Sequence, residues 1–358
     1  MRIIKKARPE EIVDSLVKEN NKYFHIPDLE QYAQKVLTIG KIIGIRDGAK
    51  LVSYILYYDN DVPFITMVWV HPEYRRRGLS KKILTALQKE FNQIRLEVHY
   101  QNPAKIMYDA FGFKDVDCKE NGQVIQEWNK SISIMQPYTY PFQGYFNLID
   151  STDHIVFYDD VNFIKRGYIH RNSILCNGNP TRFTINLHKA SQNDLIKDVN
   201  ISETFDYGKF LKTIYGSYKK APYFDAVYNM LLPTPEASKI SDFAIDSINR
   251  VYNYLGLKLN YSKSSEFFSD SMGMDRADRL IQITKDFGST HYTNASGGRT
   301  LYDKDYFKTK GITLNFCDPV IKEYKQFNGE FTPYLSIIDI LMFNSVKESI
   351  DVIRSYDI

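Results

Sequence analysis

A single glycine joins an apolar run to a helical pattern in residues 68–80, VWVHPEYRRRGLS, and this junction constrains the fold more than any other feature. The run that enters it, FITMVWV at 64–70, is apolar almost throughout, which predicts a central strand of a sheet. Apolar residues then recur every four positions on one helix face, at Leu79, Ile83, Leu87 and Phe91. A strand that passes through a short turn into a helix is the basic unit of an α/β fold.

The same alternation continues on both sides of the junction. A short strand and a helix over residues 9–23 precede a hairpin around the strong turn dipeptide Asp47-Gly48. Further strands and a short helix lead to a second hairpin, which completes an α/β unit. We therefore predict two domains, 1–130 and 131–358, in a chain of the α/β class.

The turn at residues 75–80 has the features of a phosphate-binding site. Gly78 lets the backbone approach a ligand closely, and the first N–H groups of the following helix attract anions. Arg75, Arg76 and Arg77 add positive charge beside them. The formal net charge of the whole chain is only +3, which gives no support for a dedicated nucleic-acid binder. We therefore expect a small phosphorylated ligand and no nucleic acid.

A second pattern follows one strand later. Ala104 and Tyr108 are four residues apart on a short helix that Gly112-Phe113 closes. Together with the arginine and glycine turn, this pattern resembles the GNAT family of acetyl-CoA-dependent N-acyltransferases over residues 1–130. The resemblance implies a mixed sheet flanked by helices and acetyl-CoA as the cofactor. The cofactor-binding residues that we assign from it are Val68, Val70, Arg75, Arg76, Arg77, Gly78, Leu79, Ser80, Asn102 and Tyr108.

The same resemblance suggests which residues transfer protons during acyl transfer. Tyr108 occupies the position where the family often has the acid that protonates the departing CoA thiolate. The attacking amine must lose a proton, and Glu97 on the next strand is our candidate for the general base. His71 and Glu73, near the cofactor, are alternatives, and Glu97 is equally compatible with a solvated strand position. Asn102 is shifted by one position from the family pattern, which puts its contact with the CoA arm in doubt.

Residues 131–358 carry a different set of motifs. They are QPY at 136–138, PFQGYF at 141–146, VFYDDVNF at 156–163, RN at 171–172, SGG at 296–298 and YLSIID at 334–339. Their order and spacing resemble the WbqC-like family. This resemblance implies a role in bacterial surface-polysaccharide synthesis, in which an aminoacyl group such as glycine is transferred to an amino sugar. We expect a larger mixed α/β (α+β) domain after the first one.

Three side chains of this second part are candidates for catalysis. Asp159 and Asp160 end an apolar strand, and because strand side chains alternate we expect one to face the core and the other the solvent. Such an acid could accept a proton from an amine or bind a sugar hydroxyl, but it could also cap a turn or a helix. His170 titrates near neutrality, although a single histidine is commonly structural.

Aromatic and polar residues supply the candidates for substrate binding. Gln136, Tyr138 and Tyr145 could form a wall on which a sugar or a base stacks. The same residues could instead form a rigid proline-aromatic loop that packs on the core.

Further candidates carry charge or backbone amides. Arg171, beside Asn172, could clamp a phosphate or a carboxylate with two hydrogen bonds. Ser296 and Gly297 could begin an anion-binding nest, or simply a tight turn. A polar cluster could meet a nucleotide diphosphate or form a charged helix face; it comprises Lys263, Asp275, Arg276 and Arg279.

Composition excludes several other classes of protein. The three cysteines have neither disulfide-framework nor zinc-site spacing, so we expect no metal. The first residues contain no apolar stretch of signal-peptide length, and no later run approaches the roughly 20 apolar residues of a membrane span. We therefore expect a cytoplasmic protein without a membrane span.

Three functions lead at this point, and a fourth, acetylation of protein or nucleic acid, is disfavoured by the small net charge. The leading hypothesis is a bifunctional acyltransferase that N-acetylates, and also aminoacylates, a nucleotide-linked amino sugar or an aminoacyl sugar for O-antigen synthesis. In the second, the acetyltransferase domain performs the only reaction, and the second domain binds the acceptor or an acyl or aminoacyl carrier. The third is a nonenzymatic protein that binds acetyl-CoA as a signal. Neither the acceptor sugar nor the oligomeric state follows from the sequence.

Overall fold

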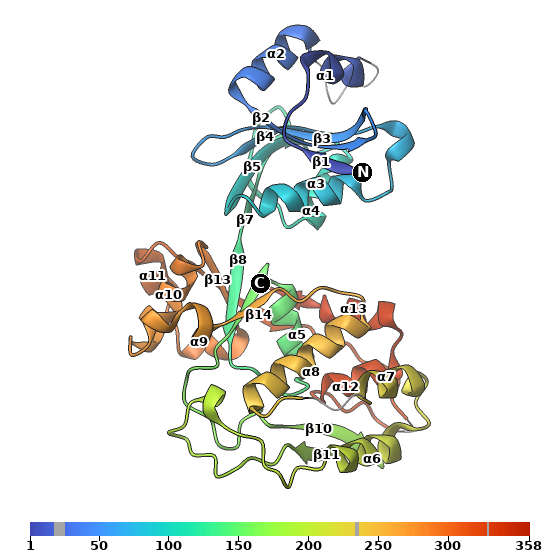
Figure 1. Cartoon of the computed structure of the whole chain (residues 1–358), viewed down its shortest axis with the longest axis vertical. Helices are drawn as coiled ribbons and strands as arrows, with labels where there is room; N and C mark the ends of the chain where they lie inside the picture. Colours follow the sequence, from blue (N-terminus) through green and yellow to red (C-terminus); the bar gives the residue numbers. More distant parts are fainter. Residues whose placement is uncertain (18–25, 233–235, 328) are drawn as a thin grey trace. The chain divides into compact units, whose positions relative to one another are not determined.

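Strands and helices alternate along the chain as predicted, and they form mixed α/β structure throughout (Figure 1). The computed structural model divides into two units, Met1–Lys130 and Ser131–Ile358, each with hydrophobic core clusters. The structure describes residues 1–17, 26–232, 236–327 and 329–358. Within these ranges, we find no helix with the length and apolarity that a bilayer crossing needs.

A mixed sheet lies at the centre of the first unit. Its described strands, in order across the sheet, are β1 (Arg2–Ile4), β2 (Lys41–Asp47), β3 (Lys50–Tyr58), β4 (Phe64–Val70), β5 (Gln93–His99), β7 (Gln123–Asn129) and β6 (Lys114–Cys118). Neighbouring strands are antiparallel except for β4 and β5, which are parallel. The apolar run at 64–70 is β4, and its interior position in the sheet confirms the prediction from composition.

Helices cover both faces of this sheet (Figure 1). One face carries α1 (Pro9–Leu16) and α2 (Leu29–Ile39), and the other carries α3 (Leu79–Gln88) and α4 (Ala104–Ala110). Because strand side chains alternate, Trp69 of β4 joins the core under α1 and α2, whereas Val68 and Val70 pack toward α3 and α4. The helix predicted over residues 9–23 is present to Leu16, and its residues 18–23 lie outside the described part of the chain.

The sheet of the second unit is mainly parallel. Its described strands, in order, are β12 (Tyr261–Lys263), β9 (His154–Phe157), β8 (Ser131–Met135), β13 (His291–Ala295), β14 (Thr313–Pro319) and the antiparallel β15 (Tyr356–Asp357). The chain begins in β8, moves outward through β9 to β12, and then continues on the other side of β8 with β13 and β14. The direction of winding therefore reverses between β8 and β13. Open α/β sheets bind ligands at such a switch point, outside the carboxyl ends of the strands.

Helices pack on both faces of this second sheet (Figure 1). The larger core includes residues of α5 (Gln143–Asp150), α8 (Ile240–Tyr254), α12 (Ile337–Phe343) and α13 (Val346–Ile353). The smaller core includes residues of α10 (Arg276–Asp286) and α11 (Lys304–Thr309). The larger core is extended by a hairpin of β10 (Arg171–Cys176) and β11 (Asn179–Thr184) with α6 (Tyr207–Tyr218) and α7 (Phe224–Leu231).

Candidate functional site

Strands β4 and β5 of the first unit separate soon after they meet. Among the described residues, the ladder between them consists of Phe64 paired with Arg95 and Ile65 with Leu96. Beyond this point, β4 continues beside β3 and β5 continues beside β7. The facing edges of two diverging strands offer backbone N–H and C=O groups to a ligand. An extended chain that contains amide groups can hydrogen-bond to such an edge as an added strand does.

The predicted phosphate turn lies at the end of β4. A short 3-10 helix at Pro72–Tyr74 follows the strand, and α3 begins directly after Gly78. Gly78 has a left-handed backbone with φ of 73°, and no atom lies within 4 Å of the position where a Cβ would be. Arg76 is also left-handed, with φ of 61°, although it is not glycine. The first N–H groups of α3 have no partner within the helix, so they are available to an anion in front of Gly78.

The arginines of this turn have different surroundings. Arg75 donates a hydrogen bond from Nε to the carbonyl oxygen of Val70 at 3.2 Å. The guanidinium of Arg77 lies over the ring of Tyr74, 5.0 Å from its centroid. Tyr74 in turn donates its hydroxyl to Asp47 at 3.0 Å. These contacts hold positive charge at the exposed edge of the turn, where a phosphate would lie.

Tyr108 of α4 shares a buried cluster with Leu79 of α3, and Val68 and Val70 of β4 pack against the same cluster. The structure thus brings together four of the residues that we assigned to the cofactor, although they come from separate elements. The Tyr108 side chain is 7% exposed, and its hydroxyl has no hydrogen bond to any other described residue. Burial raises the pKa of this hydroxyl well above that of an ordinary tyrosine. Tyr108 therefore stays protonated at neutral pH and can donate to an acceptor.

The other polar candidates of the first unit already have partners. The Asn102 side chain accepts a hydrogen bond from the amide of Ala104 at 2.9 Å, so it holds the start of α4. Glu97 is exposed and forms an ion pair with Lys119 at 2.7 Å. His71 is half-buried, and its Nδ1 accepts the backbone N–H of Glu73 at 3.3 Å. The identity of the general base stays a prediction.

In the second unit, six of the predicted residues follow strands of the same sheet, and the strands are neighbours in it. Gln136 and Tyr138 come directly after β8, and Asp159 and Asp160 come after β9. Ser296 and Gly297 follow β13, on the other side of β8. All of them therefore belong to the carboxyl ends of parallel strands around the switch point, where a ligand site is expected.

Tyr138 and Tyr145 pack against each other, with ring centroids 5.4 Å apart. Tyr145 is buried and donates its hydroxyl to the carbonyl oxygen of Gln136 at 2.8 Å, so it supports the loop from within. Asn172 is also buried, and its side-chain amide donates to the carbonyl oxygen of Tyr140 at 2.7 Å. The rigid-loop alternative thus describes Tyr145 and Asn172 well, while Tyr138 stays partly accessible.

Asp159 and Asp160 correct one expectation, because both are buried, at 1% and 2% exposure. Strand β9 ends at Phe157, so the alternation that we extended to these residues no longer applies. Asp159 accepts hydrogen bonds from the backbone N–H of Ser265 at 3.0 Å and from its hydroxyl at 2.8 Å. These bonds hold the start of the short helix α9 (Ser264–Phe267), which is the helix-cap alternative for this residue.

Asp160 is held by a different partner. It accepts hydrogen bonds from Arg279 at 2.6 Å and from the Ser264 hydroxyl at 2.5 Å. Arg279 is only 5% exposed and stacks over the ring of Tyr158 at 4.7 Å. The arginine therefore faces the interior, where it neutralises a buried carboxylate.

Two other residues of the polar cluster that we predicted around Arg279 are engaged with different partners. Lys263 forms ion pairs with Asp242 at 2.8 Å and with Glu266 at 3.1 Å. Asp275 accepts a hydrogen bond from the amide of Ala277 at the start of α10. These residues hold neighbouring segments together.

His170 is half-buried beside the ring of Phe163, whose centroid is 5.3 Å away. Burial lowers the pKa of His170 to about 4, and the charge of Arg171 contributes to the same shift. Its Nδ1 is buried without a hydrogen-bond partner in the described chain. At neutral pH the imidazole is therefore uncharged.

The SGG motif forms a short 3-10 helix, Ser296–Thr300, after β13. Ser296 is half-buried and Gly297 is exposed, with no atom within 4 Å of a Cβ added to it. Gly298 is buried because its backbone packs against the side chain of Asn294. The neighbouring Arg299 forms an ion pair with Asp318, which lies near the end of β14.

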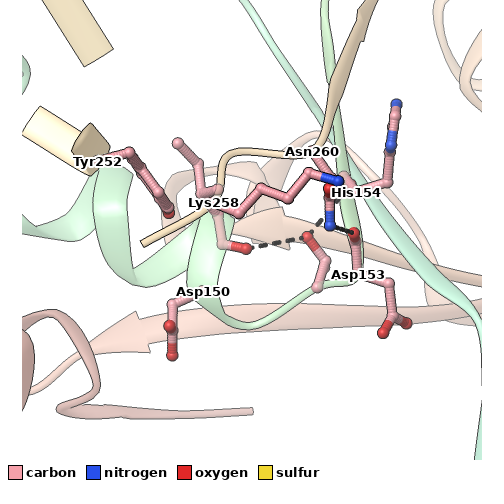
Figure 2. Close-up of a pocket in the computed structure, with 8 residues that line it drawn as sticks. Asp150, Asp153, His154, Tyr252, Lys258 and Asn260 are labelled. Atoms are coloured by element: carbon pink, nitrogen blue, oxygen red, sulfur yellow. Dashed lines mark hydrogen bonds between the residues drawn. The ribbon is translucent and has the colours of Figure 1, made fainter. Parts of the chain in front are cut away.

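A small cavity of about 100 Å³ lies at the opposite end of this sheet, next to the start of β9 (Figure 2). Figure 2 shows the Lys258 side chain extending toward Asn260, whereas Asp150 points away from both. Asp150 has partners of its own, since it lies 3.5 Å from Arg354 and accepts the Tyr356 hydroxyl at 3.3 Å. The residues that line the cavity are Ile149, Asp150, Thr152, Asp153, His154, Tyr252, Lys258 and Asn260. None of our predicted site residues is among them.

Sequence reasoning missed Tyr168 and the buried Asp339. Tyr168 is 60% exposed, and its ring centroid lies 6.1 Å from that of Tyr138. Asp339, within the YLSIID motif, accepts hydrogen bonds from Tyr218, Tyr324 and Gln326, each at 2.7 Å. Tyr168 stands between Gly167 and the apolar Ile169, and no local pattern distinguishes it; Tyr218, one of the partners of Asp339, is distant in sequence and gave no signal either.

Comparison with known proteins identifies both parts of the chain. Residues 136–351 match the model of the WbqC-like protein family, and residues 12–130 match the model of the acetyltransferase (GNAT) domain. The matches confirm both predicted resemblances in the predicted order, together with the acetyltransferase class and acetyl-CoA as the donor.

Individual relatives match a portion of the chain. The uncharacterized protein Rv1507c of Mycobacterium tuberculosis is 26% identical over 231 residues, which cover 63% of this chain and 98% of that protein. A GNAT-family acetyltransferase from Bacillus cereus is 18% identical, over 36% of this chain and 96% of that one, with a TM-score of 0.32. The PaiA N-acetyltransferase from Thermoplasma acidophilum, solved with coenzyme A, is 16% identical over 36% of this chain and 99% of its own, with a TM-score of 0.30.

Proposed function

Because the chain belongs to the WbqC-like protein family and carries a GNAT acetyltransferase domain, we propose that it N-acetylates an amino sugar linked to a nucleotide. Acetyl-CoA is the donor, and the second unit binds the acceptor. The product would be a building block of a bacterial surface polysaccharide such as O-antigen. We place the reaction in the cytoplasm, because nucleotide sugars and acetyl-CoA are both made there.

The observation that carries this proposal is the opening between β4 and β5 beside the turn at Gly78. The diverging strands leave an edge for the amide groups of the CoA arm. The turn and the start of α3 leave N–H groups and arginine side chains for its phosphates. Tyr108 lies in the cluster that joins α3, α4 and β4, and its hydroxyl has no hydrogen bond to another described residue, so we assign it to the sulfur of the donor.

In the reaction, the amine nitrogen bonds to the acetyl carbon, and the bond between that carbon and the sulfur breaks. The Tyr108 hydroxyl, protonated at neutral pH, donates to the departing sulfur and stabilises its negative charge. The amine must first lose a proton, and Glu97 and His71 are the candidate bases. Glu97 would have to leave Lys119, and His71 would have to release the Glu73 amide.

The second unit supports a binding role better than a second reaction. Asp159 and Asp160, the candidate acids for aminoacyl transfer, are buried and engaged with Ser265 and Arg279. His170 is uncharged at neutral pH, with its pKa near 4. A carboxylate that holds a helix start or an arginine is not free to accept a proton from an amine. We therefore favour a single acetyl transfer over the bifunctional scheme.

The test is release of CoA thiol by the purified full-length chain with acetyl-CoA and a panel of amino-sugar nucleotides, such as UDP-glucosamine. We expect turnover with at least one of them, and a loss of roughly 100-fold in kcat for Tyr108→Phe. Tyr57→Phe is the matched control, because Tyr57 is 3% exposed in the same cluster. The proposal is wrong if no amino-sugar nucleotide is acetylated. If the chain binds acetyl-CoA but acetylates no amine at all, the nonenzymatic alternative takes its place.

A further inference from the structure

Two tyrosine rings meet outside the carboxyl ends of neighbouring strands β8 and β9. Tyr138 follows β8, and Tyr168 belongs to the long connection after β9. Their centroids are 6.1 Å apart, with an angle of 48° between the rings. Tyr138 is half-buried against Tyr145, whereas Tyr168 is 60% exposed, so the pair presents aromatic surface to the solvent. We call Tyr138 and Tyr168 the tyrosine pair.

The loops that carry the tyrosine pair are bonded to each other. Thr139 donates both its hydroxyl, at 2.7 Å, and its backbone N–H, at 3.2 Å, to the carbonyl oxygen of Ile169. The Tyr140 amide donates to the hydroxyl of Ser247 at 2.9 Å, which anchors this loop to α8. Because these groups are buried, the two loop backbones that carry the rings are bonded to each other before any ligand arrives.

Each of these loops also contains a left-handed residue that is not glycine. Tyr140 has φ of 40° and Arg166 has φ of 67°. Non-glycine residues in this region are strained, and such strain persists where the surrounding structure enforces it, commonly at ligand sites. The two strained residues lie two positions from Tyr138 and from Tyr168, respectively.

Two side chains near the tyrosine pair in the sequence, Gln136 and Arg171, have nitrogen atoms without a hydrogen-bond partner among the described residues. The Gln136 side-chain amide has no hydrogen bond within the described residues, although it is half-buried at the end of β8. Arg171 donates its Nε to the carbonyl oxygen of Gly167 at 2.9 Å, which ties it to the Tyr168 loop. Its two terminal nitrogens have no partner in the described parts of the chain. Arg166 adds an exposed positive charge to the same loop.

We propose that this surface binds a sugar ring that carries a phosphate, as in a sugar 1-phosphate or a nucleotide sugar. The apolar face of the ring stacks on the tyrosine pair, because tyrosine offers a large rigid apolar surface with a polar tip. The terminal nitrogens of Arg171 bind the phosphate, for which a guanidinium with two free donors is suited. Gln136 can hydrogen-bond to a ring hydroxyl. The position beside the β8–β13 switch point is where such a ligand is expected.

The inference rests on the proposed function, since it identifies where the second unit holds the acceptor. The test is calorimetric titration of the full-length chain with glucosamine 1-phosphate, UDP-glucosamine and free glucosamine. We expect Tyr168→Ala to weaken the binding of both phosphorylated probes about ten-fold. Arg171→Gln should weaken the same two probes about ten-fold and leave the weak binding of glucosamine unchanged. Tighter binding of UDP-glucosamine than of the sugar 1-phosphate would identify the nucleotide sugar as the ligand, and equal binding would identify the sugar phosphate.

Matched controls come from exposed positions elsewhere in the second unit. Tyr215→Ala changes a tyrosine of α6 that is 49% exposed, and Arg182→Gln changes an exposed arginine of β11. Both should bind the probes within two-fold of the unaltered chain. The inference is overturned if these controls lose as much affinity as Tyr168→Ala and Arg171→Gln, or if the unaltered chain binds none of the phosphorylated probes.

A kinetic measurement separates this inference from the proposed function. If both are correct, Tyr168→Ala raises KM for the acceptor about ten-fold and leaves kcat unchanged. Acetylation with an unaltered KM in Tyr168→Ala would overturn the binding site but leave the acetyltransferase proposal standing. Probe binding that depends on Tyr168 and Arg171, without acetylation of any probe, would overturn the proposed function alone.

Discussion

Arg279 and Asp160 form an ion pair that is almost completely removed from solvent, with side chains 6% and 0% exposed. Arg279→Met would leave the Asp160 carboxylate buried without its counter-charge. We expect this change to lower the free energy of unfolding by about 3–5 kcal/mol, measured by urea denaturation. In the double variant Asp160→Asn/Arg279→Met, part of this stability should return because no net charge is left buried.

The exposed ion pair of Arg299 and Asp318 is the control for this prediction, with both side chains more than 40% exposed. Arg299→Met should change the free energy of unfolding by less than about 1 kcal/mol, because water screens an exposed pair. Equal losses for Arg279→Met and Arg299→Met would show that the Asp160 carboxylate does not depend on its arginine.

The lowered pKa of His170 predicts how the free energy of unfolding depends on pH. Burial places its pKa at about 4 in the folded chain, below the value of about 6.5 in an unfolded one. Between these two values the unfolded state binds more protons than the folded state. The contribution of His170 to stability is therefore intact above pH 6.5 and is lost progressively as the pH falls toward 4.

His170→Gln should make the urea midpoint less dependent on pH between about 6.5 and 4. His188→Gln, at an exposed position of the same unit, should leave that dependence as it is in the unaltered chain. Indistinguishable pH profiles for the unaltered chain and His170→Gln would contradict the shifted pKa of His170.

At the scale of elements, the turn between β4 and α3 contains a left-handed glycine, Gly78, and no atom lies close to the position that its Cβ would occupy. Gly78→Ala would strain a residue with φ of 73° by about 1–2 kcal/mol and point a methyl group into the space before α3. We expect KM for acetyl-CoA to rise about ten-fold, because the methyl group displaces a phosphate from the N–H groups. Steady-state kinetics with varied acetyl-CoA measures this effect.

Gly256→Ala supplies the matched control, since Gly256 has φ of 68° and no atom within 4 Å of an added Cβ, but lies in the second unit after α8. It should lower the melting temperature of the second unit about as much as Gly78→Ala lowers that of the first unit, and it should leave KM for acetyl-CoA unchanged. If the two variants have the same KM, the turn at Gly78 does not bind the phosphates.

Whether a segment forms a helix or a strand could largely be predicted from the sequence, whereas the contacts that set the end of an element could not. The period of four in Leu79, Ile83 and Leu87 predicted α3, and all three residues are buried. Asp159 and Asp160 were placed on a strand by the apolar run before them, but β9 ends two residues earlier. Strand ends are set by partners such as Ser265 and Arg279, which lie more than 100 residues away and leave no local pattern.

At the scale of the whole molecule, the two units have separate hydrophobic clusters, and the predicted ligands of each are different. In differential scanning calorimetry of the full-length chain we therefore expect two transitions. Acetyl-CoA at 100 times its Kd should stabilise the first unit by about 2.7 kcal/mol and raise its transition by roughly 5–10 °C. The transition of the second unit should not move with acetyl-CoA.

A single transition that moves as a whole with acetyl-CoA would contradict this independence. The reciprocal titration with UDP-glucosamine should raise the transition of the second unit. Tyr168→Ala should reduce that increase, and Tyr215→Ala should not.

The sequence by itself determined the order of the two domains, the strand, turn and helix around Gly78, and the use of acetyl-CoA. The strand, turn and helix depend on residues close together in the chain, because helix and strand periods and turn dipeptides are local properties. The order of the domains and the use of acetyl-CoA came from the resemblance of the motifs to two families. Only the tertiary structure decided that β4 and β5 separate after Ile65, that Asp160 is bound to Arg279, and that Tyr168 meets Tyr138. These are contacts between distant segments, and they form through the packing of buried surface, which no local pattern records.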